Sequence, residues 1–148
     1  MAFLSSLDIT GSALTAERFR MEIIAQNISN MNTTMTPEGT PYRRKQVVMQ
    51  ERALTFKNVL NNELRSDKAA KVSGGVRISE LIESQEEFIP VYDPKHPHAN
   101  AEGYVMMPNV DRAEEQVDMM AATTAYSANI TVFNAMKSMT MRALEIGK

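Results

Sequence analysis

The chain has 148 residues, a formal net charge of −2 and no cysteine, so it is long enough for one ordinary domain or two small ones. Hydrophobic residues make up 43% of the sequence, which excludes a wholly disordered chain. The lack of cysteine excludes disulfides and thiolate metal sites, and the net charge provides no basic field of the kind that holds nucleic acid.

The first predicted element is a helix over about residues 5–30. Apolar residues recur along it at seven-residue intervals, and a helix with such a stripe buries it against another helix. The stripe predicts subunit-packing positions at Leu7, Leu14, Met21 and Ile28, and Ile24 adds apolar surface away from it. Polar residues over 27–34 favour turns, and the prolines that follow at 37 and 41 prevent the helix from continuing.

The middle of the chain, residues 35–108, holds all six prolines and is predicted to be β-rich or extended. Val47, Val48 and Met49 indicate one strand, and residues 76–79 indicate a second after a Gly-Gly turn. Residues 88–92 indicate a third short strand, which Pro90 restricts to a sheet edge. Residues 54–64 fit either a strand or a short helix, residues 66–71 fit a mobile polar loop, and prolines make residues 93–98 irregular.

The last predicted element is a helix over residues 111–146, which no glycine or proline interrupts. At ~1.5 Å per residue it is about 54 Å long, more than a compact domain of this size needs. Asn109 or Asp111 is its expected N-cap, and the carboxylates of Glu114, Glu115 and Asp118 near its start suit the helix dipole. Its expected subunit-packing stripe consists of Val117, Ala121, Ala128, Val132, Ala135 and Met139.

These elements predict a mainly α protein with a small β-rich middle. Residues 1–34 together with residues 109–148 are expected to form a domain in which the two long terminal helices pack as a coiled coil. Residues 35–108 are expected to form a β-containing or extended insertion between them. Because both ends of the chain carry packing stripes, the termini are expected to pair with each other or with neighbouring copies.

Few residues point to catalysis or metal binding. His96 and His98, near Asp93 and Glu102, are the one candidate metal cluster in the sequence, but a third histidine is missing and prolines fix the segment. No nucleophile elbow, phosphate loop or dinucleotide fingerprint occurs. We therefore expect no catalytic residue, no cofactor and no enzyme activity, although a metal-dependent enzyme built on His96, His98 and Glu102 remains an alternative.

Two short charged runs have simple interpretations. The acidic side chains of Glu83, Glu86 and Glu87 are typical of a solvated face. The basic run over residues 43–45 is isolated in a slightly acidic chain with few aromatic residues near it. We expect it to pair with acidic residues of a neighbour rather than to bind nucleic acid or lipid.

Several stretches together resemble the bacterial flagellar axial proteins of the rod and hook class. DITGSALTAERFRM at residues 8–21 and AQNISNMNT at residues 25–33 are similar to the N-terminal signature of that class. PYRRK at 41–45 and the proline-rich segment 92–110 narrow the resemblance to the proximal rod, and residues 117–131 complete it over essentially the whole chain. The residues that carry the motif are Asn27, Asn30, Asn32, Pro41, Tyr42, Arg43, Arg44, Tyr92, Asp93, Pro94, Gly103, Tyr104, Pro108 and Asn109.

The resemblance implies a structural subunit of the proximal rod of the flagellar basal body. Such a subunit polymerises helically with other copies and with neighbouring rod proteins (FlgB, FlgF and FlgG) into the drive shaft that transmits torque and surrounds the export channel. Further implied partners are the rod-to-export-gate adaptor FliE and the flagellar export apparatus. We expect the terminal helices to be loosely folded before assembly and to fold on docking.

The implied location is the periplasmic rod, reached by export without a cleaved signal peptide. The first eight residues contain no basic leader, and no apolar run of ~18 residues is long enough to span a membrane. The main alternative function is a non-flagellar coiled-coil adaptor or chaperone that grips a partner with the same helices.

Overall fold

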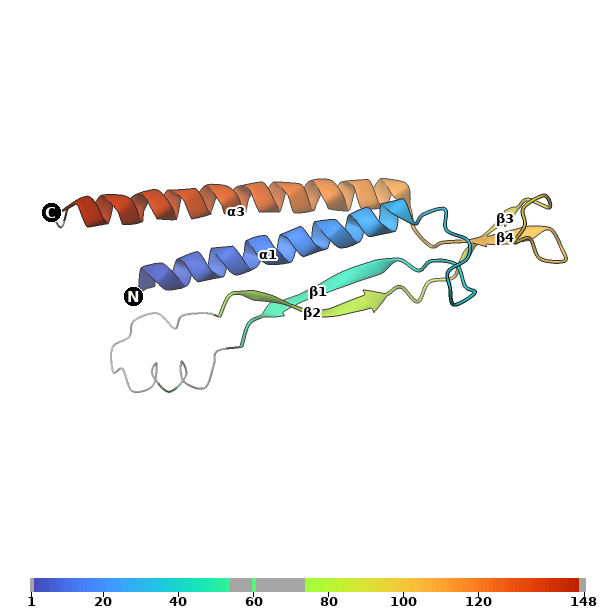
Figure 1. The fold of residues 1–148 in the computed structure, drawn as a ribbon, viewed down its shortest axis with the longest axis horizontal. Helices are drawn as coiled ribbons and strands as arrows, with labels where there is room; N and C mark the ends of the chain where they lie inside the picture. Colours follow the sequence, from blue (N-terminus) through green and yellow to red (C-terminus); the bar gives the residue numbers. More distant parts are fainter. Residues whose placement is uncertain (1, 54–59, 61–73, 147–148) are drawn as a thin grey trace.

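The computed structural model describes residues 2–53, 60 and 74–146 (Figure 1). Two long helices, α1 at Ala2–Ser29 and α3 at Arg112–Ile146, run antiparallel, so both ends of the chain lie at the same end of an elongated molecule (Figure 1). Four short strands lie between them in sequence: β1 Lys45–Glu51, β2 Val76–Glu83, β3 Ile89–Tyr92 and β4 Tyr104–Met107. The predicted fold class, two long terminal helices with a small β middle, is confirmed.

Local chemistry explains where the helices begin and end. After α1, the Asn30 N–H donates to the carbonyls of Gln26 and Asn27, and the chain leaves the helix axis through a turn. The start of α3 is capped by Asp111, whose Oδ1 accepts the Ala113 N–H at 2.8 Å. Of the two expected N-caps, Asp111 is therefore the cap of this helix.

The strands form two separate antiparallel pairs. β1 pairs with β2 from Lys45↔Glu83 to Glu51↔Val76, with a register shift between Val48 and Met49. β3 pairs with β4 from Ile89↔Met107 to Tyr92↔Tyr104, and this hairpin projects beyond the ends of the helices (Figure 1). The three predicted strands are confirmed. The expectations for residues 54–64 and 66–71 lie outside the described residues, apart from Leu60.

β4 was not predicted from the sequence. Its signal is the apolar run Tyr-Val-Met-Met, which follows Gly103. Gly103 has a φ of +84°, a conformation that disfavours any residue with a Cβ, and the Asp93 N–H donates to its carbonyl across the hairpin. The prolines indicate irregular structure over residues 93–98, and no element was predicted for residues 104–107, where the strand lies.

The β1–β2 hairpin lies against α1, on the side away from α3 (Figure 1). The Val76 N–H donates to Ser12 Oγ at 3.0 Å, which fixes the start of β2 on the helix. Gly75 is needed here, because it has a φ of +83° and an added Cβ would lie 2.4 Å from Ser12 Oγ. α1 is thus the middle layer of the molecule.

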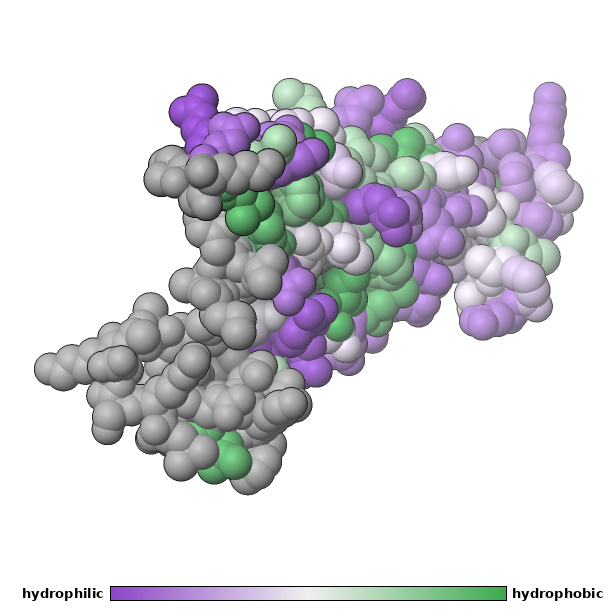
Figure 2. Space-filling model, turned by 60° about the vertical axis from the view of Figure 1, so that its left-hand side comes forward, coloured by the Kyte–Doolittle hydropathy of each residue, from purple (hydrophilic) through white to green (hydrophobic). Residues whose placement is uncertain are grey.

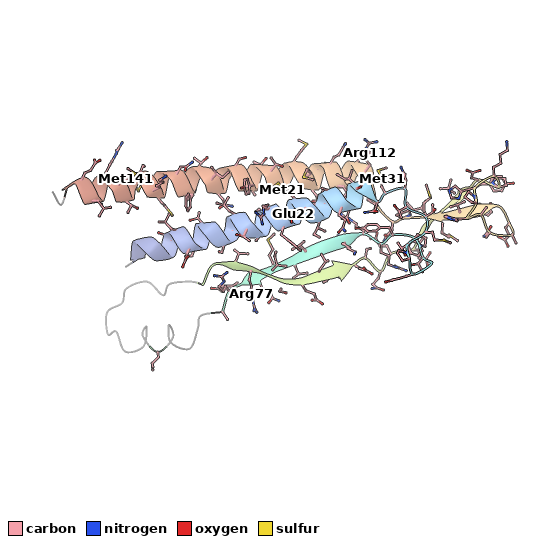
Figure 3. All side chains as sticks on the ribbon, in the orientation of Figure 1. Met21, Glu22, Met31, Arg77, Arg112 and Met141 are labelled. Atoms are coloured by element: carbon pink, nitrogen blue, oxygen red, sulfur yellow. The ribbon has the colours of Figure 1, made fainter. Side chains whose placement is uncertain are left out.

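Among the described residues, the buried hydrophobic side chains are Ala16, Ile23, Ile24, Tyr42, Val105, Val110 and Ala122. Of the predicted packing residues in α1, Ile24 is buried, whereas Leu7, Leu14, Met21 and Ile28 are half-buried. Met21 lies between α1 and α3, where its sulfur accepts a hydrogen bond from the Thr123 hydroxyl at 3.7 Å (Figure 3).

α3 packs on α1 with a different face from the one predicted. Most of the buried and half-buried side chains repeat in heptads along the opposite side of α3, at Glu115, Met119, Ala122, Tyr126, Asn129, Phe133, Met136 and Thr140, and the half-buried Asp118 and Ala125 lie next to this stripe. All six predicted stripe residues are exposed, including Val117 at 66% and Met139 at 60%. The part of the prediction that placed Val117, Ala121, Ala128, Val132, Ala135 and Met139 against α1 of the same chain is therefore wrong.

Candidate functional site

A buried polar cluster joins the C-terminal end of α1, the start of β1 and the start of α3. At its centre is Arg44, which is 8% exposed. Its Nε donates to Glu115 Oε1 at 2.5 Å, its Nη1 to Glu114 Oε1 at 2.9 Å and its Nη2 to Asp118 Oδ2 at 3.1 Å. Each nitrogen of the guanidinium therefore has its own carboxylate, and all three carboxylates come from the first two turns of α3. We call this cluster the Arg44 junction.

Asn27, at 1% exposure, connects α1 to this cluster. Its Oδ1 accepts the Tyr42 hydroxyl at 2.8 Å and the Lys45 N–H at 3.0 Å. Its Nδ2 donates to the Lys45 carbonyl at 2.8 Å and to Glu115 Oε2 at 3.1 Å. The amide thus uses its full hydrogen-bonding capacity, and it pairs with both backbone groups of Lys45 as a neighbouring strand would.

Asn109 ties the segment before α3 to the same cluster. Its Oδ1 accepts the Arg44 N–H at 3.0 Å, and its Nδ2 donates to the Glu86 carbonyl at 3.4 Å. Asn109 and the neighbouring Pro108 are both buried. The segment that leads from β4 into α3 is therefore held to the start of β1 and to the segment after β2.

The electrostatics of the junction raise the pKa of two of its side chains, Tyr42 and Arg44. Burial, followed by the negative charges of Glu115 and Glu83, raises the pKa of Tyr42 to about 12, so its hydroxyl remains a donor. Burial by itself lowers the pKa of Arg44, but the hydrogen bond to Glu115 and the charges of Glu115 and Glu114 outweigh it, and the pKa is raised. Arg44 is therefore permanently charged.

The junction has no reactive arrangement. Among the described side chains, Glu17 Oε2 is the buried polar atom without a hydrogen-bond partner, and it lies outside the junction. A groove of about 360 Å³ opens beside the junction, with Arg20, Ile23, Val47 and Met49 in its lining. Because the polar groups of the junction are engaged with one another, it is suited to hold three segments at a fixed angle.

Comparisons with known proteins identify the family. Residues 7–34 match the model described as "Flagella basal body rod protein", and residues 101–146 match "Flagellar basal body rod FlgEFG protein C-terminal". The chain is 44% identical over 152 residues to "Flagellar basal-body rod protein FlgC" of Bacillus subtilis, with all of both chains covered. The chain belongs to the FlgC family of flagellar basal-body rod proteins.

Two further relatives carry the same name. The FlgC of Salmonella typhimurium is 41% identical over 148 residues, again with all of both chains covered. The FlgC of Borreliella burgdorferi is 36% identical over 157 residues, with 99% of this chain and 98% of the relative covered. The two matched family regions contain most of α1 and all of α3, and they meet at the Arg44 junction through the Asn27–Glu115 hydrogen bond, whereas Arg44 itself lies between the two regions in sequence.

Most of the FlgC-family motif residues predicted from the sequence fall into two groups. Asn27, Tyr42, Arg44 and Asn109 meet in the Arg44 junction. The rest of the basic run lies beside it. Arg43 lies 4.4 Å from the centre of the Phe88 ring and donates to the Ser84 carbonyl at 3.1 Å.

The second group lies at the β3–β4 hairpin. The rings of Tyr92 and Tyr104 pack edge to face with their centres 5.3 Å apart, over the turn at Gly103. Pro94 and Asp93 belong to the same turn region. Three motif residues lie apart from both groups: Asn30 donates to the Gln26 carbonyl, Asn32 is exposed and Pro41 is half-buried.

The expected partner of the basic run needs a correction. Arg44 does pair with acidic side chains, but these belong to α3 of the same chain and not to a neighbour. The sequence indicated only a dipole role for Glu114, Glu115 and Asp118. The signal that was missed is their i, i+1, i+4 spacing, which places the carboxylates near one another on the first turns of a helix.

The two histidines lie in the turn after β3. Their ring centres are 5.3 Å apart, and His98 Nδ1 is 2.9 Å from the Thr34 hydroxyl. Within the described part of the chain, no group of three or more His, Asp or Glu side chains is placed to hold a metal ion. No helix of that part is both long and apolar enough to cross a bilayer.

Proposed function

We propose that the chain is a structural, non-catalytic subunit of the proximal rod, which polymerises helically with other rod proteins around an export channel. Membership of the FlgC family supports a structural role in the flagellar rod. The structural observation that carries the proposal is the exposed apolar stripe of α3, which includes Val117, Val132 and Met139 and faces away from α1. A long, exposed apolar stripe suits packing against further subunits.

The face of the molecule seen in Figure 2 carries exposed apolar patches between polar ones, which is consistent with an assembling subunit. A helix with apolar residues on more than one side has more than one neighbour, and a head-to-tail contact that does not close generates a helical tube. We propose that the predicted stripes of α1 and α3 make contacts between subunits as well as within one.

The Arg44 junction suggests how such a subunit could transmit torque. It links α1 and α3, which belong to the proposed terminal-helix domain of residues 1–34 and 109–148, to the proposed insertion of residues 35–108. Buried, fully paired polar networks rigidify the segments they join. We propose that the junction fixes the angle between the helices and the insertion, so that load passes between them without bending.

The proposed partners are other copies of the chain, the neighbouring rod proteins FlgB, FlgF and FlgG, the adaptor FliE and the flagellar export apparatus. The proposed location is the periplasmic rod, reached by export without a cleaved signal peptide. The adaptor and metal-enzyme alternatives have no specific support in the geometry described above.

The proposal is tested by tagging the chain in its own bacterium and probing detergent-resistant basal bodies for it. Stable incorporation, with loss of motility on deletion, is the expected result. Recovery of the chain only in the soluble fraction, with motility unaffected by deletion, would overturn the rod assignment and favour the coiled-coil adaptor.

A further inference from the structure

α1 covers only part of the two edges of the β1–β2 hairpin. At one end, the Asn27 amide pairs with the backbone of Lys45 on the edge of β1. At the other end, Ser12 Oγ accepts the Val76 N–H on the edge of β2. Because β1 and β2 are antiparallel, these two contacts lie at diagonally opposite corners of the hairpin. The second half of β2 therefore has an edge that α1 does not cap.

The register shows which backbone groups point outward on that edge. The Ser84 N–H donates to the Arg44 carbonyl at 2.8 Å, directly after the last residue of β2. Backbone groups alternate in direction along a strand, so those of Ile82 point toward β1 and those of Leu81 and Glu83 point away from it. Among the described elements, β2 lies against β1 and α1 only.

The same edge exposes apolar side chains. Leu81 and Ile82 are each 42% exposed, and every residue of β2 from Ser79 onward is exposed. An exposed edge strand with apolar side chains is a template for another strand, which gains backbone hydrogen bonds on pairing. β4 is different, because Asn100 already accepts the Tyr104 N–H and donates its own N–H to the Tyr104 carbonyl on the outer edge.

The charges around this edge are mostly negative. Glu80, Glu83, Glu86 and Glu87 are all exposed within eight consecutive residues that contain no basic side chain. Among the described residues, two cations lie near them: Lys45, with its Nζ 3.8 Å from Glu83 Oε1, and Arg43, whose Nη1 donates to the carbonyls of Ser84 and Glu86. Two copies pairing through this edge would bring acidic side chains together, which is unfavourable. The surface fits a basic partner.

We propose that the outward edge of β2 at Leu81–Glu83 accepts an extended segment of a neighbouring subunit that carries both basic and apolar side chains on each of its faces. Successive side chains of β2 point to opposite faces, so Glu80 and Ile82 share one face and Leu81 and Glu83 share the other. The backbone of the incoming strand pairs with Leu81 and Glu83, its basic side chains meet Glu80 and Glu83, and its apolar side chains cover Leu81 and Ile82. The identity of the partner as a rod subunit rests on the proposed function, whereas binding of such a segment does not.

The first test uses the full-length chain and two capped eight-residue peptides, one with the repeat Lys-Lys-Val-Val (the Lys peptide) and one with the repeat Glu-Glu-Val-Val (the Glu peptide), so that each face of either peptide carries both residue types. Amide hydrogen exchange is followed by NMR at millimolar peptide. The Lys peptide is expected to slow exchange at Leu81 and Glu83 by about tenfold, the size of one net hydrogen bond, and to leave Ile82 unchanged. Equal protection by both peptides, or none by either, would overturn the proposal.

Substitutions separate the backbone from the charges. Leu81→Pro removes the outward N–H and leaves the bonds to β1, so it is expected to abolish protection at Glu83 while helix content and the melting curve stay unchanged. The matched control, Leu81→Thr, keeps the N–H and is expected to retain binding. A chain with Glu80→Lys and Glu83→Lys is expected to prefer the Glu peptide. If Leu81→Pro does not fold, this variant tests the proposal, and a continued preference for the Lys peptide would overturn it.

Incorporation into basal bodies distinguishes this proposal from the rod assignment. Normal incorporation of a folded Leu81→Pro chain would reject strand addition in the cell and leave the rod function standing. If the wild-type chain binds the Lys peptide but is absent from basal bodies, the result would support strand addition at the edge of β2 and reject the rod function.

Discussion

Arg44 and Glu115 form a buried ion pair, with Nε and Oε1 2.5 Å apart, although the two residues are separated by 71 positions in the sequence. The two residues are 8% and 1% exposed. Breaking such a pair by removing one partner leaves an uncompensated buried charge. The pair therefore couples the position of the insertion to the rotation of α3.

Arg44→Ala is expected to destabilise the chain by about 3–5 kcal/mol, because Glu115 loses its cation while it stays buried. Urea denaturation of the purified chain followed by circular dichroism measures this change. Arg20→Ala is the control, since Arg20 is partly exposed and its contact with Asp118 is 3.7 Å long. That variant is expected to lose less than about 1 kcal/mol. Equal losses in the two variants would contradict the central role of Arg44.

The raised pKa of Tyr42 predicts a specific pH dependence. Its ordinary pKa is 10.0 and its value in the fold is about 12, so the neutral hydroxyl is favoured by folding. Its contribution to stability is complete below pH 10 and is lost as the pH rises toward 12. Wild-type stability should therefore fall more steeply than that of Tyr42→Phe between about pH 10 and 12. Parallel curves would show that Tyr42 does not titrate with a raised pKa.

The helix ends, and three of the strands, could be predicted from local chemistry. Each of these signals affects only the few residues next to it in the sequence. The signals are Asp111 as a cap, Pro37 and Pro41 after α1, and the Gly-Gly turn before β2. The face of α3 that packs on α1 could not be predicted in this way. α3 has more than one face with apolar residues at helical spacing, and a residue two positions from Glu115 lies about 200° around the helix.

The contacts of Glu115 determine which face of α3 packs on α1. Because it must reach Arg44 and Asn27, the positions at heptad spacing from it, such as Ala122, face α1. Val117 then faces outward. This choice depends on partners distant in the sequence, so periodicity alone does not identify the stripe that packs on α1 of the same chain. The carboxylates that pair with Arg44 are also distant from it in the sequence, which explains why the sequence favoured a partner on a neighbouring subunit.

The free subunit is expected to be more loosely folded at one end of α1 than at the other. Ile23, Ile24 and Asn27 are buried near the Arg44 junction, whereas Leu7 and Leu14 are only half-buried. Amide exchange on the monomer should show protection that falls from Asn27 toward Leu7, since local opening is easiest where burial is least. Uniformly strong protection over residues 7–28 would reject the idea that this helix is completed by docking.

Leu14→Asp is expected to block assembly. Leu14 is half-buried in α1, and an aspartate there would place an unpaired charge in a helix seam. The measurement is the amount of the variant in purified basal bodies, with Thr15→Asp as the control, because Thr15 is exposed on the adjacent side of the helix. Normal incorporation of Leu14→Asp would count against the seam at this position.

Val132→Asp separates contacts between subunits from contacts within one. Val132 is 43% exposed on the outward stripe of α3, so the aspartate stays solvated in the monomer and stability should change by less than about 0.5 kcal/mol. In the rod, the same charge would be buried against a neighbouring helix, and incorporation into basal bodies should be lost. Ser127→Asp, at an exposed position on another side of α3, is expected to incorporate normally. If Val132→Asp assembles as well as Ser127→Asp, the outward stripe is not an interface, and the contacts between subunits must lie on other surfaces of the molecule.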